Sequence, residues 1–96
     1  MTMLTGLSPS QATALHDVAA ERIRQDAKWG EQNHSPEWWL AILSEEVGEL
    51  ATAILRDHFT AGEYEHRSVQ SIRAEAIQIA AVAVALVECL DRQERG

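Results

Sequence analysis

Apolar residues recur at helical spacing in three segments of this chain, and a helix-start signal precedes the first two. Ser8-Pro9-Ser10-Gln11 supplies an N-cap serine, a proline at the first helical position and a glutamine that can close a capping box. Ser35-Pro36-Glu37 repeats the serine and the proline and adds an acid in the first turn. Ser68 can cap the third segment. The pattern predicts helices over residues 8–27, 35–58 and 68–95.

Two polar stretches separate the predicted helices. Lys28-Trp29-Gly30 ends the first helix with a cation, an aromatic residue and a breaker, and a loop follows as far as His34. Phe59 to Arg67 has no hydrophobic period, which predicts a mobile loop. The 96 residues suffice for one domain, so we expect a single all-α domain over residues 1–96.

The third helix is unusually apolar. Between Ile77 and Val87 it is apolar on every side except for Gln78. A helix that is hydrophobic all round is buried all round, and two other helices of so short a chain can hardly cover it. We therefore expect a homodimer or homotetramer, with a four-helix-bundle core built by two three-helix protomers.

The charge of the chain excludes several classes of protein. Fifteen acids against eight basic residues give a formal net charge of −7, which argues against binding to a nucleic-acid polymer or to an anionic membrane surface. No segment reaches the roughly 18 apolar residues of a membrane span, and none has the pattern of a signal peptide. Cys89 lies in an apolar helix and is expected to be a buried small hydrophobe in a reducing compartment. These features predict a soluble, cytoplasmic protein.

Acidic residues interrupt the apolar stripe of the second helix. At about 100° per residue, Glu46 falls between Ile42 and Leu50, inside the apolar arc. Glu49 lies at the edge of the arc, and Glu45 lies slightly further round. Three acids therefore crowd one margin of a side that should be buried.

Glu75 is placed in a similar way on the third helix. The same count puts it near the middle of the predicted core face, among Ile72, Ile79, Val82, Leu86 and Leu90. A lone ionised carboxylate buried there costs several kcal/mol, so some partner must compensate these glutamates.

Two kinds of compensation are possible. In the first, an arginine such as Arg22, on the apolar side of the first helix, pairs with Glu46 or Glu75, or a carboxyl group stays protonated. In the second, a hard cation such as Mg²⁺ takes carboxylate oxygens and substrate phosphates as ligands. Glu46 and Glu49 are three residues apart and repel each other unless a cation lies between them. The spacing alone leaves both possibilities open.

A family resemblance bears on this choice. Glu45-Glu46-Val47-Gly48-Glu49-Leu50, followed 25 residues later by Glu75-Ala76-Ile77-Gln78, resembles the paired acidic motif of the MazG-like nucleotide pyrophosphohydrolases, relatives of the dimeric dUTPases. The stretch from Arg24 to His34 resembles the segment before that motif in short, phage-type and actinobacterial members. The likeness runs from about Glu21 to Asp91.

The resemblance implies an enzyme. It implies hydrolysis of a nucleoside or deoxynucleoside triphosphate to the monophosphate and pyrophosphate, with water attacking the α-phosphorus, in the cytoplasm, or in the host cytoplasm if the chain is phage-encoded. Mg²⁺ is the implied cofactor, and Mn²⁺ can substitute for it. Glu46, Glu49 and Glu75 match the metal-binding carboxylates. Glu45 matches the acid that positions or deprotonates the water, so Glu45 and Glu46 are the catalytic candidates.

Gln78 departs from the family pattern, which commonly has Asp at this place. Its side chain offers one carbonyl oxygen and no charge, so as a metal ligand it implies fewer metals, weaker binding or a lost activity. Gln78 therefore favours a rival hypothesis, in which a non-catalytic helical module binds nucleotides or a protein partner and keeps the acids for structure.

Four residues are candidates for substrate binding. Lys28, with Arg24 one turn before it, can bind phosphates, or both can simply favour the end of the helix. Trp29 can stack on a base or plug the end of a bundle. Trp38 can join the nucleotide pocket, whereas Trp39 points into the core. The spacing of the histidines fits no zinc pattern, and the chain has no P-loop or nucleophile elbow.

Overall fold

The computed structural model consists of three helices, and it describes residues 5–59 and 69–95. The helices are α1 (Pro9–Trp29), α2 (Pro36–Phe59) and α3 (Val69–Arg95), and the described residues contain no strand. The all-α prediction is confirmed, and every helix bound lies within two residues of its predicted place. The expected cap at Ser68 and nearly all of the loop expected after α2 lie outside the described residues.

The predicted helix starts are built as their sequences indicate. The Gln11 backbone N–H donates to Ser8 Oγ at 3.1 Å, and the Ser8 N–H donates to Gln11 Oε1 at 2.7 Å, which completes the capping box. The Trp38 N–H donates to Ser35 Oγ at 3.2 Å. α1 continues through Lys28 and Trp29 and ends at Gly30, whose φ of 73° suits a residue without a β-carbon.

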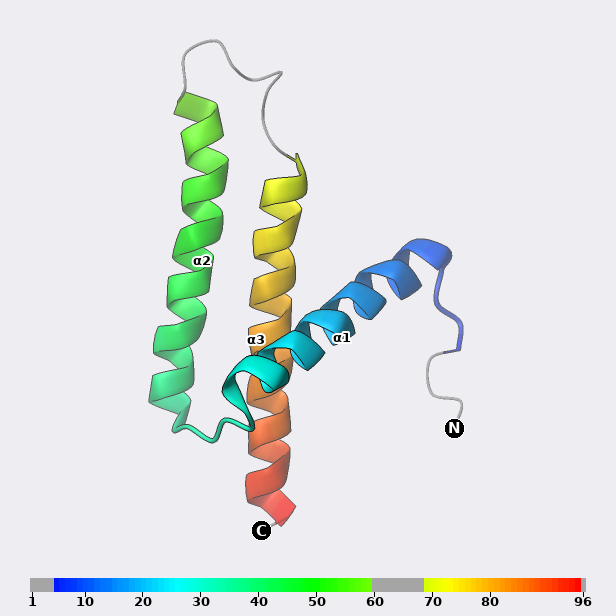
Figure 1. Cartoon of the computed structure of the whole chain (residues 1–96), viewed down its shortest axis with the longest axis vertical. Helices are drawn as coiled ribbons and strands as arrows, with labels where there is room; N and C mark the ends of the chain where they lie inside the picture. Colours follow the sequence, from blue (N-terminus) through cyan, green and yellow to red (C-terminus); the bar gives the residue numbers. More distant parts are fainter. Residues whose placement is uncertain (1–4, 60–68, 96) are drawn as a thin grey trace.

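The helices are arranged as a hairpin with a crossing arm (Figure 1). α2 and α3 run side by side in opposite directions, and α1 crosses α3 and projects away from the pair. In the described part of the chain, α1 and α2 both pack on α3 and make no comparable contact with each other. The orientation of α1 relative to α2 is therefore set through α3.

A small core lies between the carboxyl-terminal half of α3 and the start of α2. Trp39, Val82 and Cys89 are buried there, with Ile42, Leu43, Ala85 and Leu86 packed against them. The Cys89 thiol donates to the main-chain oxygen of His34 at 3.7 Å. The predictions of a core Trp39 and a buried Cys89 are confirmed.

The predicted core face of α3 is partly wrong. Val82 is buried as expected, but Leu90 is 41% exposed and Glu75 is only half-buried. Ala81, Val82 and Cys89 are the buried residues of α3, because α1 and α2 cover adjoining sides of this helix and leave the side with Leu90 open. Glu75 therefore lies at the margin of the packed surface rather than at its centre.

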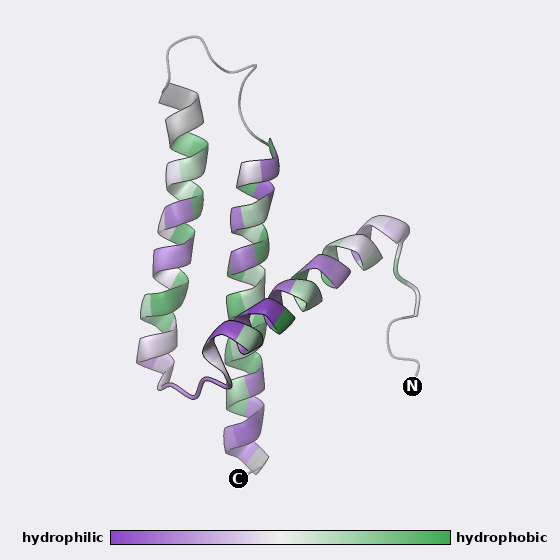
Figure 2. Ribbon diagram, in the orientation of Figure 1, coloured by the Kyte–Doolittle hydropathy of each residue, from purple (hydrophilic) through white to green (hydrophobic). Residues whose placement is uncertain are grey.

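Apolar side chains also remain uncovered on the outer sides of the hairpin. On α2 these are Leu40, Val47 and Leu55, and on α3 they are Val69, Val84, Val87 and Leu90. Figure 2 shows hydrophobic residues recurring along both helices, whereas α1 and the loop after it are mainly hydrophilic. No helix in the described ranges is long and apolar enough to cross a membrane.

Candidate functional site

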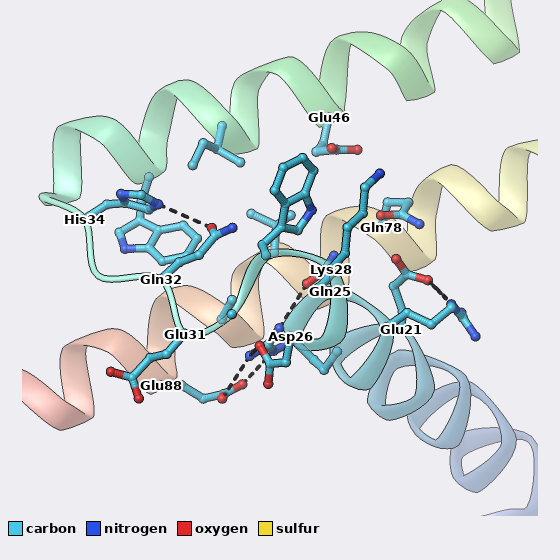
Figure 3. Close-up of a pocket in the computed structure, with 18 of the residues that line it drawn as sticks. Glu21, Gln25, Asp26, Lys28, Glu31, Gln32, His34, Glu46, Gln78 and Glu88 are labelled. Atoms are coloured by element: carbon cyan, nitrogen blue, oxygen red, sulfur yellow. Dashed lines mark hydrogen bonds and ion pairs between the residues drawn. The ribbon is translucent and has the colours of Figure 1, made fainter.

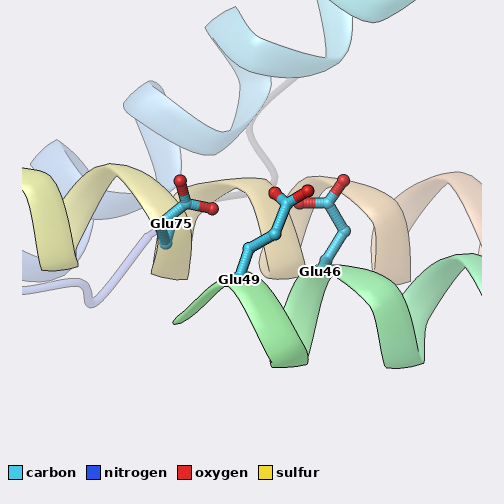
Figure 4. Close-up of side chains that lie close together, drawn as sticks. All are labelled: Glu46, Glu49 and Glu75. Carbon is cyan, nitrogen blue, oxygen red and sulfur yellow. The ribbon is translucent and has the colours of Figure 1, made fainter. Parts of the chain in front are cut away.

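Three glutamates predicted as metal ligands meet between α2 and α3. Glu46, Glu49 and Glu75 each offer a carboxylate oxygen, and these oxygens all lie within 4.8 Å of one another. Glu46 and Glu49 are three residues apart on α2 and project toward one place, and Glu75 of α3 faces them (Figure 4). The packing of the hairpin thus joins the two acidic segments into one cluster.

The cluster is electrostatically uncompensated in the described part of the chain. Burial raises the pKa of the Glu46 carboxyl group above its ordinary value, and the charges of Glu49, Glu75 and Glu45 raise it further. Glu75 Oε2 is buried without a hydrogen-bond partner. A buried acceptor that lacks a donor is uncommon in native structures, and a proton or a cation would satisfy this oxygen.

Arg22 does not provide the compensation. Its guanidinium binds Glu88 at 2.7 Å and Asp26 at 2.9 Å instead. Among the described residues, no basic side chain forms an ion pair with Glu46, Glu49 or Glu75. The possibility that Arg22 neutralises these acids is therefore wrong.

A pocket of about 950 Å³ lies beside the cluster. It is bordered by the end of α1, the loop after it, the first half of α2 and α3 from Gln78 to Arg92 (Figure 3). Glu46 belongs both to its wall and to the acidic cluster, and Gln78 lies on the same wall. The half-buried Gln78 can therefore offer its amide oxygen to a ligand in this part of the pocket, whereas the exposed Glu45 lies outside the lining.

Lys28 and Trp29 form the cationic side of the pocket. Lys28 Nζ lies 4.8 Å from the centroid of the Trp29 ring, within the range of a cation–π contact. The Lys28 side chain extends toward the side of the pocket that holds Glu46 and Gln78 (Figure 3), and within the described ranges it forms no ion pair. Trp29 is 61% exposed, so in one chain it does not plug the end of a bundle.

Arg24 and Trp38 also line the pocket. Arg24 is engaged, because its guanidinium binds Glu21 Oε1 at 2.6 Å, and it is less available than Lys28 to an anion. Trp38 is 60% exposed, and its ring centroid lies 6.2 Å from that of His34. The pocket thus collects all four residues that the sequence suggests for substrate binding.

Several pocket residues escape the sequence patterns. His34 packs edge-on against the Trp39 ring at 5.0 Å, and its Nε2 lies 3.3 Å from Gln32 Oε1. Arg92 of α3 donates to the Gln32 main-chain oxygen at 2.9 Å and to Asn33 Oδ1 at 3.0 Å. These contacts fix the loop between α1 and α2 on α3. Arg92 lies about sixty residues from its partners, and only its position near a helix end can be seen in the sequence.

Comparison of the chain with protein-family models, with curated proteins and with solved structures gave no match.

Proposed function

We propose that the chain is a cytoplasmic, Mg²⁺-dependent nucleotide pyrophosphohydrolase of the MazG-like type, which hydrolyses a nucleoside or deoxynucleoside triphosphate to the monophosphate and pyrophosphate. The observation that carries the proposal is the convergence of Glu46, Glu49 and Glu75 beside a pocket that contains Lys28, which forms no ion pair with any described residue.

The donor set of the cluster fits a hard divalent cation. Glu46, Glu49 and Glu75 would hold Mg²⁺, or Mn²⁺ in its place, through carboxylate oxygens, and Gln78 would add a neutral oxygen. The orphaned Oε2 of Glu75 and the raised pKa of Glu46 both support a site that lacks its positive partner. When bound, the metal ion supplies charge neutralisation on the phosphates and a lowered pKa of a coordinated water.

The pocket residues would bind and orient the nucleotide. Lys28 would donate to the phosphates on the side where Glu46 lies, and Trp29 or Trp38 would offer an aromatic face to the base. Arg24 would contribute to the cationic side only after partial release from Glu21.

The reaction needs a proton acceptor. As the water oxygen bonds to the α-phosphorus, the bond to the bridging oxygen breaks and pyrophosphate leaves with the electron pair. The proton released by the water would pass to a carboxylate. Glu45 is the proposed acceptor, and Glu46, which lines the pocket, is the alternative.

A second copy of the chain would complete the fold. The radius of gyration is 15.9 Å, against about 12.5 Å for a compact chain of this length. Most of the uncovered apolar residues lie on the two helices of the hairpin, although Leu15, Ile23 and Trp29 of α1 are exposed as well. This distribution suits the pairing of two hairpins into a four-helix bundle. We therefore propose a homodimer or a homotetramer.

One observation favours the rival function. Gln78 brings no negative charge to the wall that it shares with Glu46, which would suit a helical module that binds nucleotide or protein without hydrolysis.

The decisive experiment measures pyrophosphate release. Purified protein would be assayed with each of the eight common nucleoside and deoxynucleoside triphosphates, with Mg²⁺ and with EDTA. The proposal expects release with at least one triphosphate, only in the presence of the metal. Binding of a triphosphate without release would support the nucleotide-binding form of the rival. Neither binding nor release would overturn the enzyme and leave only the protein-binding form of the rival.

A further inference from the structure

The two sides of the proposed active site lie on different helices. Lys28 and Trp29 lie on α1, whereas the acidic cluster lies on α2 and α3. In the described chain, α1 packs on α3 and not on α2. The placement of Lys28 relative to Glu46 therefore depends on the contacts that hold the end of α1 on α3, together with the short loop that leads from α1 into α2.

Arg22 makes a bidentate polar contact between α1 and α3. Its Nε donates to Glu88 Oε2 at 2.7 Å and its Nη2 donates to Glu88 Oε1 at 3.1 Å, which is a bidentate pair. The Arg22 side chain is only 13% exposed, and Glu88 raises its pKa. A planar guanidinium held at both carboxylate oxygens fixes an orientation as well as a distance.

Arg22 also holds the last turns of its own helix. Its Nη1 donates to Gln25 Oε1 at 3.1 Å, and its Nη2 donates to Asp26 Oδ1 at 2.9 Å. Asp26 in turn accepts the Gly30 N–H at 2.8 Å through its main-chain oxygen, where α1 ends. One side chain thus links α3 to the segment that carries Lys28.

We propose that Arg22 and Glu88 are a positioning pair, which holds the end of α1 at the angle that places Lys28 on the phosphate side of the pocket. Both residues line the pocket wall. Their role is indirect, since both side chains are engaged with protein partners and act through the placement of α1. The inference rests on the proposed function, because it assigns to Lys28 a phosphate to bind.

A second ion pair provides a matched control. Arg73 of α3 binds Asp17 of α1 at 2.7 Å, so it also joins the two helices. Neither residue lines the pocket, and the pair lies three turns nearer the start of α1 than Lys28 does. A purely structural role for Arg22 would make its removal resemble the removal of Arg73.

The test compares Arg22→Gln, Arg22→Lys, Glu88→Gln, the Arg22→Gln/Glu88→Gln double variant and Arg73→Gln with the wild type. KM and kcat would be measured with the triphosphate that the wild type hydrolyses fastest, alongside the melting temperature and Mn²⁺ affinity without nucleotide. We expect Arg22→Gln to raise KM about tenfold or more and to change kcat less, since misplacing a binding group by an ångström has effects of this size.

The remaining variants separate positioning from stability. The double variant should have a KM no higher than that of Arg22→Gln, because the two residues act as one unit. Arg22→Lys should fall between the glutamine variant and the wild type, since it keeps the charge and loses the fork. Mn²⁺ affinity should stay at the wild-type value in all variants, because the cluster lies on α2 and α3. Arg73→Gln should lower the melting temperature and leave KM unchanged.

Three outcomes would overturn the inference. The first is a wild-type KM in Arg22→Gln together with a lower melting temperature, and the second is strictly additive KM effects in the double variant. Either of these leaves the pyrophosphohydrolase proposal standing. The third is a wild-type protein that hydrolyses no triphosphate, and that result removes the proposed function as well.

Discussion

Glu46 and Glu75 present carboxylate oxygens within 4.8 Å of each other, although 29 residues separate them along the chain. At this separation two ionised carboxylates repel strongly, and the described chain supplies no ion pair to either of them. The packing of α2 on α3 therefore keeps a destabilising contact in place. A cation that binds between these groups would convert that contact into a stabilising one.

Replacing Glu75 with glutamine should distinguish the destabilising repulsion within the cluster from the role of the cluster in metal binding. We expect Glu75→Gln to weaken Mn²⁺ binding at least about tenfold, because it removes a charged oxygen ligand, and to abolish Mg²⁺-dependent turnover. In EDTA its melting temperature should equal or exceed that of the wild type, since one of three like charges is gone. Calorimetric titration with Mn²⁺ and thermal melts in EDTA check both parts. Unchanged metal affinity would show that Glu75 is not a ligand.

The raised pKa of Glu46 predicts how the metal-free protein responds to pH. A carboxyl group whose pKa is higher in the folded state stabilises the fold while it is protonated, and this contribution is lost as pH rises through the raised pKa. In EDTA the stability of the wild type should therefore decline as pH rises above the ordinary titration range of glutamate. The stability of Glu46→Gln should decline less.

The Glu46→Gln variant is needed because other groups contribute to stability with the opposite dependence on pH. Arg73 lowers the pKa of Asp17, so the Asp17 contribution is present above its ordinary range and is lost as pH falls. The difference in melting temperature between the wild type and Glu46→Gln, measured as a function of pH, isolates the contribution of Glu46. A difference that does not vary with pH would mean that the Glu46 pKa is not raised.

Lys28 is the only lysine of the chain, and its removal should weaken substrate binding. We expect Lys28→Met to raise KM for the Mg²⁺-bound triphosphate about tenfold or more, since a charge-assisted hydrogen bond is worth about 1.5–3 kcal/mol. Lys28→Arg should retain most of the affinity. Arg24→Met is the comparison within α1, and it should have the smaller effect because Glu21 already engages Arg24. Equal KM values for Lys28→Met and the wild type would remove Lys28 from the site.

Gln78→Asp should test whether the neutral residue limits the metal site. A fourth carboxylate on the wall that Glu46 occupies should increase metal affinity by about tenfold and increase turnover. In EDTA the same variant should melt at a lower temperature, because it adds a like charge to the cluster. Gln78→Glu, with a longer arm, and Gln78→Ala provide the comparisons. Lower metal affinity in Gln78→Asp than in the wild type would show that Gln78 is not beside the ion.

Val87 is 55% exposed on the uncovered side of α3 and should be buried in the assembly. Val87→Glu should therefore dissociate the oligomer, because burying a valine contributes about 1.5–3 kcal/mol per copy and a buried unpaired charge opposes association. Light scattering after size-exclusion chromatography measures the change in mass. Gln70→Glu, at an exposed polar position of the same helix, is the control and should keep the wild-type mass. A monomeric wild type would contradict the proposed assembly directly.

The features that depend on neighbouring residues were predictable in detail. The capping box of Ser8 and Gln11 involves residues three apart, and the spacing of Glu46 and Glu49 puts both on one side of α2. Helical periodicity also identified Trp39 and Cys89 as buried, because each lies in a long apolar stripe. These predictions need only the geometry of a single helix.

The partner of Arg22 shows where such reasoning stops. Periodicity put Arg22 on the packed side of its helix and suggested Glu46 or Glu75 as partner, but the structure pairs it with Glu88. A helical wheel gives the direction of a side chain and not the neighbour that it meets. Glu75 was misplaced for the same reason, since the buried side of α3 depends on where α1 crosses it.

The sequence by itself determined the three helices, the starts of the first two and the side of α2 on which Glu46 and Glu49 lie, because short-range hydrogen bonds and the 3.6-residue period fix them. The tertiary structure alone decided which helices meet and at what angle. It brought Glu75 close to Glu46, paired Arg22 with Glu88 and formed the pocket that Lys28 lines. Those relations depend on how side chains of separate helices pack together, and no local pattern in the chain encodes them.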